Sequence, residues 1–99
     1  MNEASHTALT ASLSRMITIR NQRGLHARAA AKFVKLCSQF TAEVAVIKGD
    51  TVVTGTSIMG LMMLAAGPGT ELELRASGAE AAAALAALAD LIERRFDED

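Results

Sequence analysis

Two residues suited to phosphate chemistry stand close together near the start of a helical pattern. His26 follows the turn NQRGL, and Arg28 comes two positions later. His26 falls at the expected N-cap or first residue of a helix, where unpaired backbone amides point outward with partial positive charge. Because that field disfavours an imidazolium, we expect a neutral, nucleophilic and solvent-facing ring. Arg28 can offer a planar fork of donors to phosphate. The pattern predicts a transient phosphohistidine, and the competing interpretation is an ordinary surface histidine.

Other chemistries have less support in these residues. A metal site would need a second ligand at helical spacing from His26, and Cys37 falls on an apolar stripe, where it is expected to face inward. No G-x-S-x-G motif or paired acid indicates a serine hydrolase. Aromatic residues make up 3% of the chain, with no Trp or Tyr, so base stacking on nucleic acid is poorly supported. We therefore expect no metal, no cofactor and no nucleic acid.

The small net charge of −1 hides a division along the chain. Residues 4–42 contain no carboxylate, whereas residues 71–99 hold eight acids against three arginines. The basic residues of the first segment are Arg15, Arg20, Arg23, Arg28, Lys32 and Lys35. Such a division indicates either a solvated helix face or a local positive field that attracts an anionic group or an acidic partner.

Length and composition predict one soluble domain. Ninety-nine residues, of which 51% are hydrophobic, are enough for one core. No apolar run approaches the roughly 20 residues of a membrane span, and the single Cys37 cannot form an internal disulfide, which fits a reducing cytoplasm. We expect a cytoplasmic monomer with a flexible tail over residues 1–14, where His6 has no visible function, and a single domain over 15–99.

Periodicity predicts an alternation of strands and helices. The stretch 15–21 alternates as a strand, and 27–40 reads as a helix with one apolar stripe. Two β-branched runs, TAEVAVIKG and TVVTG, meet at Gly49-Asp50, a two-residue hairpin turn. A short helix follows Ser57, and TELELRASG alternates as a last strand. Ser77 and Glu80 form a predicted capping box for a final helix. The apolar positions of that helix are Leu85, Leu88, Ile92 and Phe96.

This order predicts an α+β fold. The polar alternation of the last strand indicates a sheet with one solvated face, so the sheet should be antiparallel or mixed with all helices on its other face.

The short helix SIMGLMMLAAG carries more apolar surface than one core face can bury. Its apolar side chains cover roughly 260° of the helix circumference, whereas a core-facing stripe needs little more than about 100°. If Leu61 and Leu64 point inward beside Ala65, then Ile58, Met59 and Met62 cannot all be buried. A neighbouring loop or the N-terminal tail could cover them. The interpretation we favour is an exposed, adaptable docking surface.

Two motifs resemble one known family. GLHARAAA, residues 24–31, is similar to the phosphorylation-site signature of HPr, the histidine-containing phosphocarrier of the bacterial sugar phosphotransferase system. TSIMGLMML, residues 56–64, resembles the family's second landmark, a serine that opens a short helix, and the similarity extends over about residues 15–96. The resemblance implies an open-faced β-sandwich of βαββαβα order, with a four-stranded antiparallel sheet under three helices.

The resemblance also assigns roles to individual positions. It implies that His26 takes phosphate on Nδ1 from Enzyme I and passes it to an EIIA-type domain, and that Arg28 accompanies the phosphate. Ser57 corresponds to a serine that a dedicated HPr kinase/phosphorylase modifies in some lineages. The positions at which the family docks its partners are Leu25, Ala27, Ile58, Met59 and Met62.

Departures from the family pattern leave alternatives open. Ala29 stands where many members have proline, and Thr56 precedes Ser57 where many place a basic residue. Gly60 lies within the short helix, and Ser57 already has a sufficient reason to exist as an N-cap. Regulation at Ser57 is therefore a weaker inference than transfer at His26. The chain fits both the sugar-type carrier and its nitrogen-related paralogue. A different class is a non-transferring regulatory module of the same fold that acts by docking alone.

Overall fold

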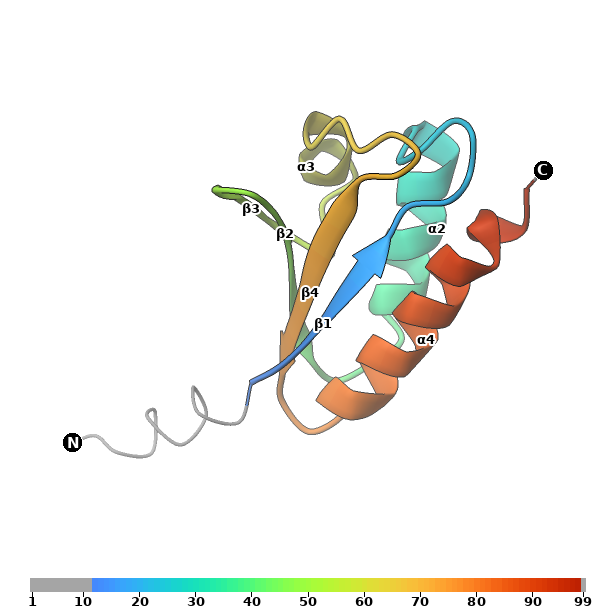
Figure 1. Ribbon diagram of the computed structural model, residues 1–99. Coiled ribbons are helices and arrows are strands. Elements are labelled where there is room, and N and C mark those ends of the chain that lie inside the picture. Colours follow the sequence, from blue (N-terminus) through green and yellow to red (C-terminus); the bar gives the residue numbers. More distant parts are fainter. Residues whose placement is uncertain (1–11, 99) are drawn as a thin grey trace.

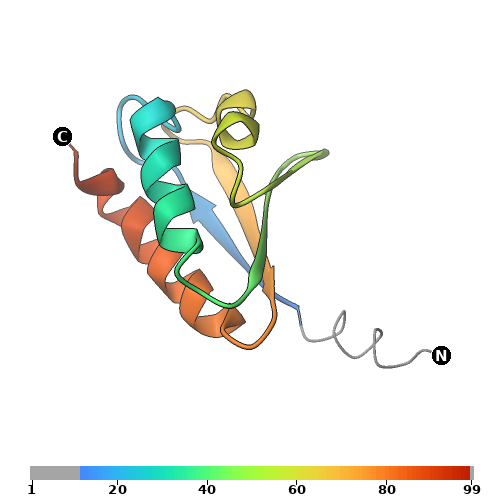
Figure 2. The ribbon, with the colours of Figure 1, turned by 180° about the vertical axis from the view of Figure 1, so that it is seen from behind.

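The computed structural model describes residues 12–98, so nearly all of the predicted tail over 1–14 lies outside the described residues. One four-stranded sheet with the strand order β1-β4-β2-β3 carries the helices on one face, and every neighbouring pair is antiparallel (Figures 1 and 2). The elements in chain order are β1 (Leu13–Thr18), α2 (Ala27–Cys37), β2 (Glu43–Lys48), β3 (Thr51–Thr54), α3 (Ile58–Met63), β4 (Glu71–Ser77), α4 (Ala81–Glu93) and the short turn η1 (Arg95–Asp97). The predicted fold class is confirmed.

The alternation of the central strand β4 sorts its side chains onto two faces. Leu72, Leu74 and Ala76 are buried beneath the helices, while Glu71 and Arg75 are exposed on the other face. The edge strand β1 pairs with β4 from Leu13 to Thr18, so it begins and ends earlier than the predicted 15–21. The difference arises because Asn21 belongs to the turn that leads into α2.

The predicted hairpin and helix stripe are both present. β2 and β3 are joined at Gly49-Asp50, and Gly49 has a φ of +57°, which glycine adopts without strain. In α2, Ala30, Phe33 and Cys37 are buried, and burying a side chain such as Phe33 is worth about 2–3 kcal/mol. Burial raises the pKa of the Cys37 thiol, as expected for a small core residue. The helix ends at Cys37, three residues before the predicted end.

Two predictions about the final helix are wrong. The Ser77–Glu80 capping box does not form, because Ser77 remains in β4 and Glu80 is itself the N-cap residue of α4. The Glu80 carboxylate instead accepts the backbone N–H of Thr41 at 2.6 Å, which ties the helix start to the loop before β2. Phe96 is buried as expected, but α4 ends at Glu93 and Phe96 lies in the turn beyond it.

None of the helices within residues 12–98 is long and apolar enough to cross a membrane.

Candidate functional site

The loop before α2 is fixed against the segment that follows α3. Gly24 has a φ of +64°, and a Cβ at this position would lie 2.2 Å from the carbonyl oxygen of Ala66. That same carbonyl accepts the backbone N–H of Leu25 at 3.0 Å. Glycine is therefore required at position 24 both for its backbone conformation and for the close approach of Ala66. The loop holds the backbone immediately before His26 in one position.

His26 is the N-cap residue of α2, as predicted. Its backbone is extended, with φ −72° and ψ 176°, and its carbonyl accepts the first helical hydrogen bond from Ala30 at 2.8 Å. The imidazole does not cap the helix. Within residues 12–98, the backbone N–H groups of Ala27, Arg28 and Ala29 have no hydrogen-bond partner. The start of α2 thus presents three donors with partial positive charge to any anion beside it.

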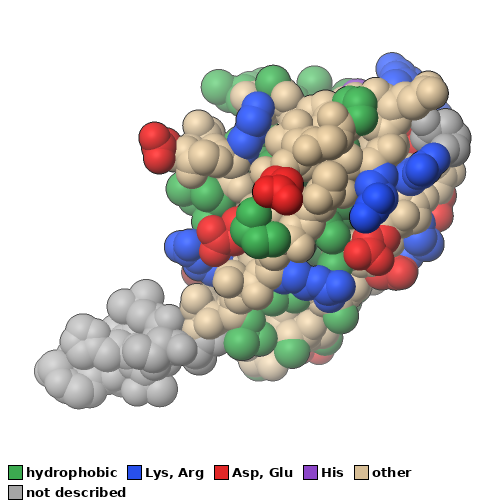
Figure 3. Space-filling model, in the orientation of Figure 1, with side chains coloured by type: hydrophobic (Ala, Val, Ile, Leu, Met, Phe, Trp, Pro, Cys, Tyr) green, Lys and Arg blue, Asp and Glu red, His purple; other side chains and the backbone are tan. Residues whose placement is uncertain are grey.

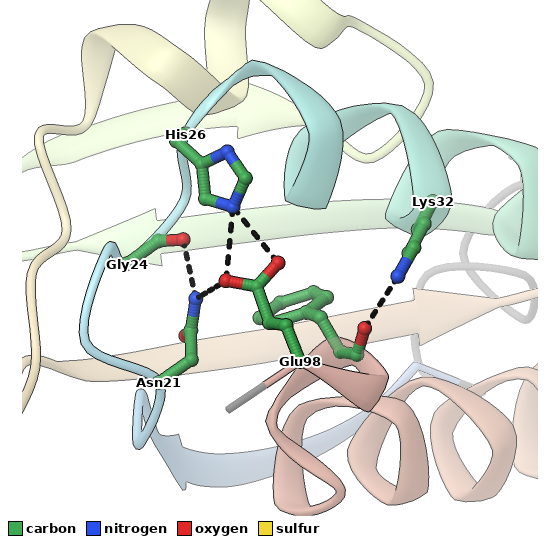
Figure 4. A network of polar contacts seen from close by, with 6 residues as sticks. Asn21, Gly24, His26, Lys32 and Glu98 are labelled. Atoms are coloured by element: carbon green, nitrogen blue, oxygen red, sulfur yellow. Dashed lines mark hydrogen bonds and ion pairs between the residues drawn. The ribbon is translucent and has the colours of Figure 1, made fainter.

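The imidazole of His26 contacts a carboxylate that the sequence analysis did not predict. His26 Nε2 lies 3.0 Å from Oε1 and 2.9 Å from Oε2 of Glu98 (Figure 4). Nδ1, which has no hydrogen-bond partner among the described residues, points away from Glu98 toward the chain entering α2. The His26 side chain is 14% exposed. The expectation of a freely solvent-facing ring is therefore wrong, because Glu98 covers one side of it.

The turn that brings Glu98 to the ring has an unusual backbone. Arg95, Phe96 and Asp97 all have positive φ, between 56° and 60°. Three consecutive left-handed residues cost roughly 3–6 kcal/mol, at about 1–2 kcal/mol each. Burial of the Phe96 side chain stabilises the turn by about 2–3 kcal/mol. The hydrogen bond from Lys32 Nζ to the carbonyl of Phe96, at 2.6 Å, contributes about 1.5–3 kcal/mol. Contacts to α2 and the core therefore hold this conformation.

The contacts of Glu98 favour its ionised form. Asn21 Nδ2 donates to Oε1 at 3.0 Å and also to the carbonyl of Gly24 at 2.8 Å. Desolvation raises the pKa of Glu98, but hydrogen bonds from Asn21 and His26, together with electrostatic attraction to the His26 ring and Lys32, outweigh it. The pKa of Glu98 therefore lies below its ordinary value of 4.5. Asn21 is fully buried, so this arrangement is part of the folded structure.

Arg28 occupies the first turn of α2 and is exposed. Within the described part of the chain, its guanidinium makes no hydrogen bond or ion pair. It is thus available to an anion that approaches the start of the helix. The space-filling view shows several Lys and Arg side chains on the right of the molecule, with Asp and Glu side chains among them (Figure 3).

The apolar surface predicted on α3 is present. The exposed fractions are 42% for Ile58, 73% for Met59, 43% for Met62 and 74% for Met63, and these four residues line a shallow groove. We call them the α3 surface. Leu61 and Leu64 are buried as predicted. Ala65 was expected to pack beside them but is exposed with a φ of +52°, and Ala66 is buried in its place.

The two docking residues predicted in the loop and the first turn of α2 have different environments. Ala27 is exposed, as a docking residue must be. Leu25 is 6% exposed and belongs to the core, so its expected place on the docking surface is wrong. Leu25 packs in the hydrophobic core, and its backbone N–H is bonded to Ala66, which is also buried.

Ser57 begins α3 as predicted. Its hydroxyl oxygen accepts the backbone N–H of Gly60 at 2.9 Å, which is an N-cap hydrogen bond. A Cβ at Gly60 would lie 3.0 Å from that oxygen and 3.2 Å from Cβ of Val53, so glycine allows α3 to lie close to β3. The departure from the family pattern at Gly60 thus has a packing reason.

Sequence reasoning missed Glu98 as the neighbour of His26, and Asn21 and Lys32 as contacts of the segment that carries Glu98. It also missed Met63 as part of the α3 surface. The separation of a basic first segment from an acidic C-terminal segment was the only sequence signal for the contact between Glu98 and His26. A larger hollow formed by β2, β3 and β4 is lined by neither His26 nor Arg28. The free helix donors, His26 and Arg28 therefore define the site, although they do not form a deep cleft.

A histidine at a helix start that lacks a side-chain cap, in an open-faced sheet with helices on one face, is the arrangement that the phosphohistidine motif predicted. The family model described as PTS HPr component phosphorylation site matches residues 13–94. The chain belongs to this HPr phosphocarrier family of the phosphotransferase system. The motif resemblance found in the sequence is thereby confirmed.

Individual relatives and one solved structure agree with this assignment. The chain is 55% identical over 86 residues to Phosphocarrier protein HPr of Neisseria meningitidis serogroup A, which covers 87% of this chain and 97% of the relative. It is 43% identical over 86 residues to Phosphocarrier protein NPr of Shewanella violacea, covering 87% and 94%. The crystal structure of HPr-C-His from Thermoanaerobacter tengcongensis superimposes with a TM-score of 0.84 at 41% identity, covering 88% of this chain and 98% of that one.

Proposed function

We propose that this protein is a phosphocarrier in which Nδ1 of His26 accepts a phosphoryl group from phosphorylated Enzyme I and passes it to an EIIA-type protein. The observation that carries the proposal is the start of α2. There, His26 stands beside the N–H groups of Ala27, Arg28 and Ala29, which have no partner among residues 12–98, and the exposed guanidinium of Arg28 lies on the same turn. These donors suit a phosphoryl group bound to nitrogen.

A carrier must bind its phosphate only moderately, because the phosphate has to leave again. One arginine and three backbone donors satisfy that condition better than a closed pocket of charges would. The partner proteins supply most of the in-line geometry for transfer. The protein is on this proposal not an enzyme but a phosphorylated intermediate between enzymes, and we infer that it acts in the cytoplasm.

The α3 surface is the proposed docking area for both partners, together with Ala27. Thioether side chains such as those of Met59 and Met62 adapt to differently shaped surfaces, which suits a protein that meets Enzyme I and EIIA in turn. Ser57 at the start of α3 is the proposed target of an HPr kinase/phosphorylase. Its hydroxyl already accepts an internal hydrogen bond, so phosphorylation would have to replace that N-cap interaction.

The proposal is tested by incubating the purified protein with Enzyme I and phosphoenolpyruvate and measuring its intact mass. We expect a gain of one phosphate that is stable in base and lost in acid, as phosphoramidates are. The matched pair of variants is His26→Ala, which should gain nothing, and His6→Ala, which should gain one phosphate like the parent. Full phosphorylation of His26→Ala would refute the proposal, as would the absence of any phosphate on the parent protein.

A second stage separates the two branches of the family. Phosphorylated protein is mixed with a sugar-type EIIA or with a nitrogen-related EIIA, and the loss of phosphate from the carrier is followed in time. The EIIA that accepts phosphate faster identifies the branch. Failure of both to accept it from a phosphorylated carrier would contradict the onward transfer while leaving the uptake step intact.

A further inference from the structure

The last described residues of the chain lie against the start of α2. Glu98 follows η1, and both of its carboxylate oxygens are within 3.0 Å of Nε2 of His26, 72 residues away in sequence (Figure 4). We call Arg94–Glu98 the C-terminal strap. The strap connects the end of α4 to the ring that the proposed function uses.

The strap is held in place on several sides. Phe96 is fully buried in the core, and Lys32 on α2 donates a hydrogen bond to its carbonyl oxygen. Arg94 forms ion pairs with both Asp90 and Asp97. A left-handed turn of three non-glycine residues persists only where the surrounding structure determines it. The position of Glu98 is therefore set by the fold and does not depend on its contact with His26 alone.

An ionised carboxylate has only acceptors, so a hydrogen bond between it and Nε2 requires the proton on that nitrogen. In a neutral imidazole the other nitrogen then carries the lone pair. Asn21 donates to Oε1 of the same carboxylate, which fixes its orientation. The nitrogen with the lone pair is Nδ1, and it points away from Glu98 toward the chain entering α2 (Figure 4).

We propose that Glu98 is a positioning residue, which holds the His26 ring in one orientation with its proton on Nε2 and thereby presents Nδ1 as the nucleophile. The inference rests on the proposed function. In the transfer step, the Nδ1 lone pair forms the new bond to phosphorus, and the donor's nitrogen–phosphorus bond breaks with its electron pair left on the donor nitrogen. The Nε2 proton stays on the ring, hydrogen-bonded to Glu98, whose negative charge balances the positive charge that the phosphorylated ring gains.

The first test measures the tautomer in the free protein, without any partner. The ¹⁵N chemical shifts of the labelled His26 ring are recorded at neutral pH for the parent protein, Glu98→Ala, Glu98→Gln and the control Glu93→Gln. Glu93 is an exposed carboxylate at the end of α4. We expect protonated Nε2 in the parent and in Glu93→Gln. Glu98→Ala should give a mixture of tautomers, and Glu98→Gln should retain the parent tautomer because its amide oxygen still accepts.

The second test measures phosphoryl uptake by the same four proteins from phosphorylated Enzyme I. Loss of the partner that orients a metal-binding histidine lowers affinity or activity by roughly 10–100-fold, and we expect about the lower end of that range here. We expect that loss in kcat for Glu98→Ala, with KM for the carrier unchanged, because Glu98 does not belong to the docking surface. Glu98→Gln should fall between Glu98→Ala and the parent, since it keeps the hydrogen bond and lacks the charge.

Two results would overturn the inference. One is a Glu98→Ala protein whose ring tautomer and kcat both equal those of the parent. The other is faster uptake in Glu98→Ala, which would make the strap a cover that hinders phosphorylation. If the parent protein takes no phosphate at all, the proposed function fails, and the tautomer measurement still decides whether Glu98 orients the ring.

Discussion

The helices α2 and α3 begin in opposite ways. Ser57 opens α3 and satisfies the N–H of Gly60 with its own hydroxyl, whereas His26 opens α2 and leaves the three N–H groups of the first turn without a protein partner in the described structure. A side-chain cap is worth about 1 kcal/mol of stability, so its absence at α2 has a cost. Among the described residues, the start of α2 thus keeps backbone donors that an anion could use, whereas Ser57 already occupies one at the start of α3.

From the comparison of the two helix starts, we expect the largest effect on phosphoryl uptake at Arg28, apart from the loss of His26 itself. Arg28→Ala should lower the rate of phosphoryl uptake by roughly 100-fold, because it removes the one exposed charged donor on the first turn of α2. Arg28→Lys should recover only part of that loss, since lysine lacks the planar fork. The measurement is single-turnover transfer from phosphorylated Enzyme I. Equal rates for all three proteins would show that the backbone donors suffice.

A change on the α3 surface should act on binding and leave the chemistry intact. Met62→Glu is expected to raise KM for the carrier by roughly tenfold or more, because it places a charge in the groove formed with Ile58, Met59 and Met63. The matched control is Val52→Glu on β3, which is 62% exposed and outside that groove. Steady-state kinetics with Enzyme I measures KM and kcat for both variants. An unchanged KM for Met62→Glu, or an equal rise in the control, would contradict docking at α3.

The cap of α3 predicts an effect on stability alone. Ser57→Ala should reduce the free energy of unfolding by about 1 kcal/mol, since the N–H of Gly60 loses its partner. Ser57→Gly should lose only a few tenths of a kcal/mol. Urea unfolding measures both. Phosphoryl uptake at His26 should stay within about twofold of the parent, and a much larger loss would mean that the two helix starts are not independent.

The contacts of Glu98 predict a smaller effect that depends on pH. The pKa of Glu98 is lowered in the folded protein, so its ionised contacts stabilise the fold above its ordinary value of 4.5. That contribution is lost as the pH falls below 4.5 through the lowered pKa. The difference in unfolding free energy between the parent and Glu98→Gln should therefore shrink as the pH falls from about 5 toward 3. Urea unfolding at each pH measures it, and a difference that grows in acid would contradict the direction of the shift.

Local patterns in the sequence predicted most of the fold. The alternation in β4, the apolar stripe of α2, the Gly49-Asp50 turn and the N-cap at Ser57 depend on neighbouring residues, which a sequence displays directly. The same reasoning placed His26 at the start of α2. It also found the excess apolar surface of α3, because the number of side chains exceeds what one helix face can bury.

The remaining features depend on contacts between distant segments. Phe96 satisfies the helical spacing of the last helix, yet the chain leaves the helix at Glu93 and buries the ring through a left-handed turn that its residue types disfavour. The acidic character of the C-terminal segment was the only hint that Glu98 reaches His26, and it does not single out that residue. Glu80 satisfies the spacing of a capping box and bonds to Thr41 instead. In each case a tertiary contact outweighed a local preference.

The approach of Ala66 to Gly24 links the position of α3 to that of the loop before His26. The carbonyl oxygen of Ala66 lies where a Cβ at position 24 would have to be. The same oxygen accepts the backbone N–H of Leu25, the residue immediately before His26. The segment that follows α3 is thereby tied to the loop that leads into the earlier helix α2. If a partner docks on the α3 surface as proposed, this contact would set its position relative to His26.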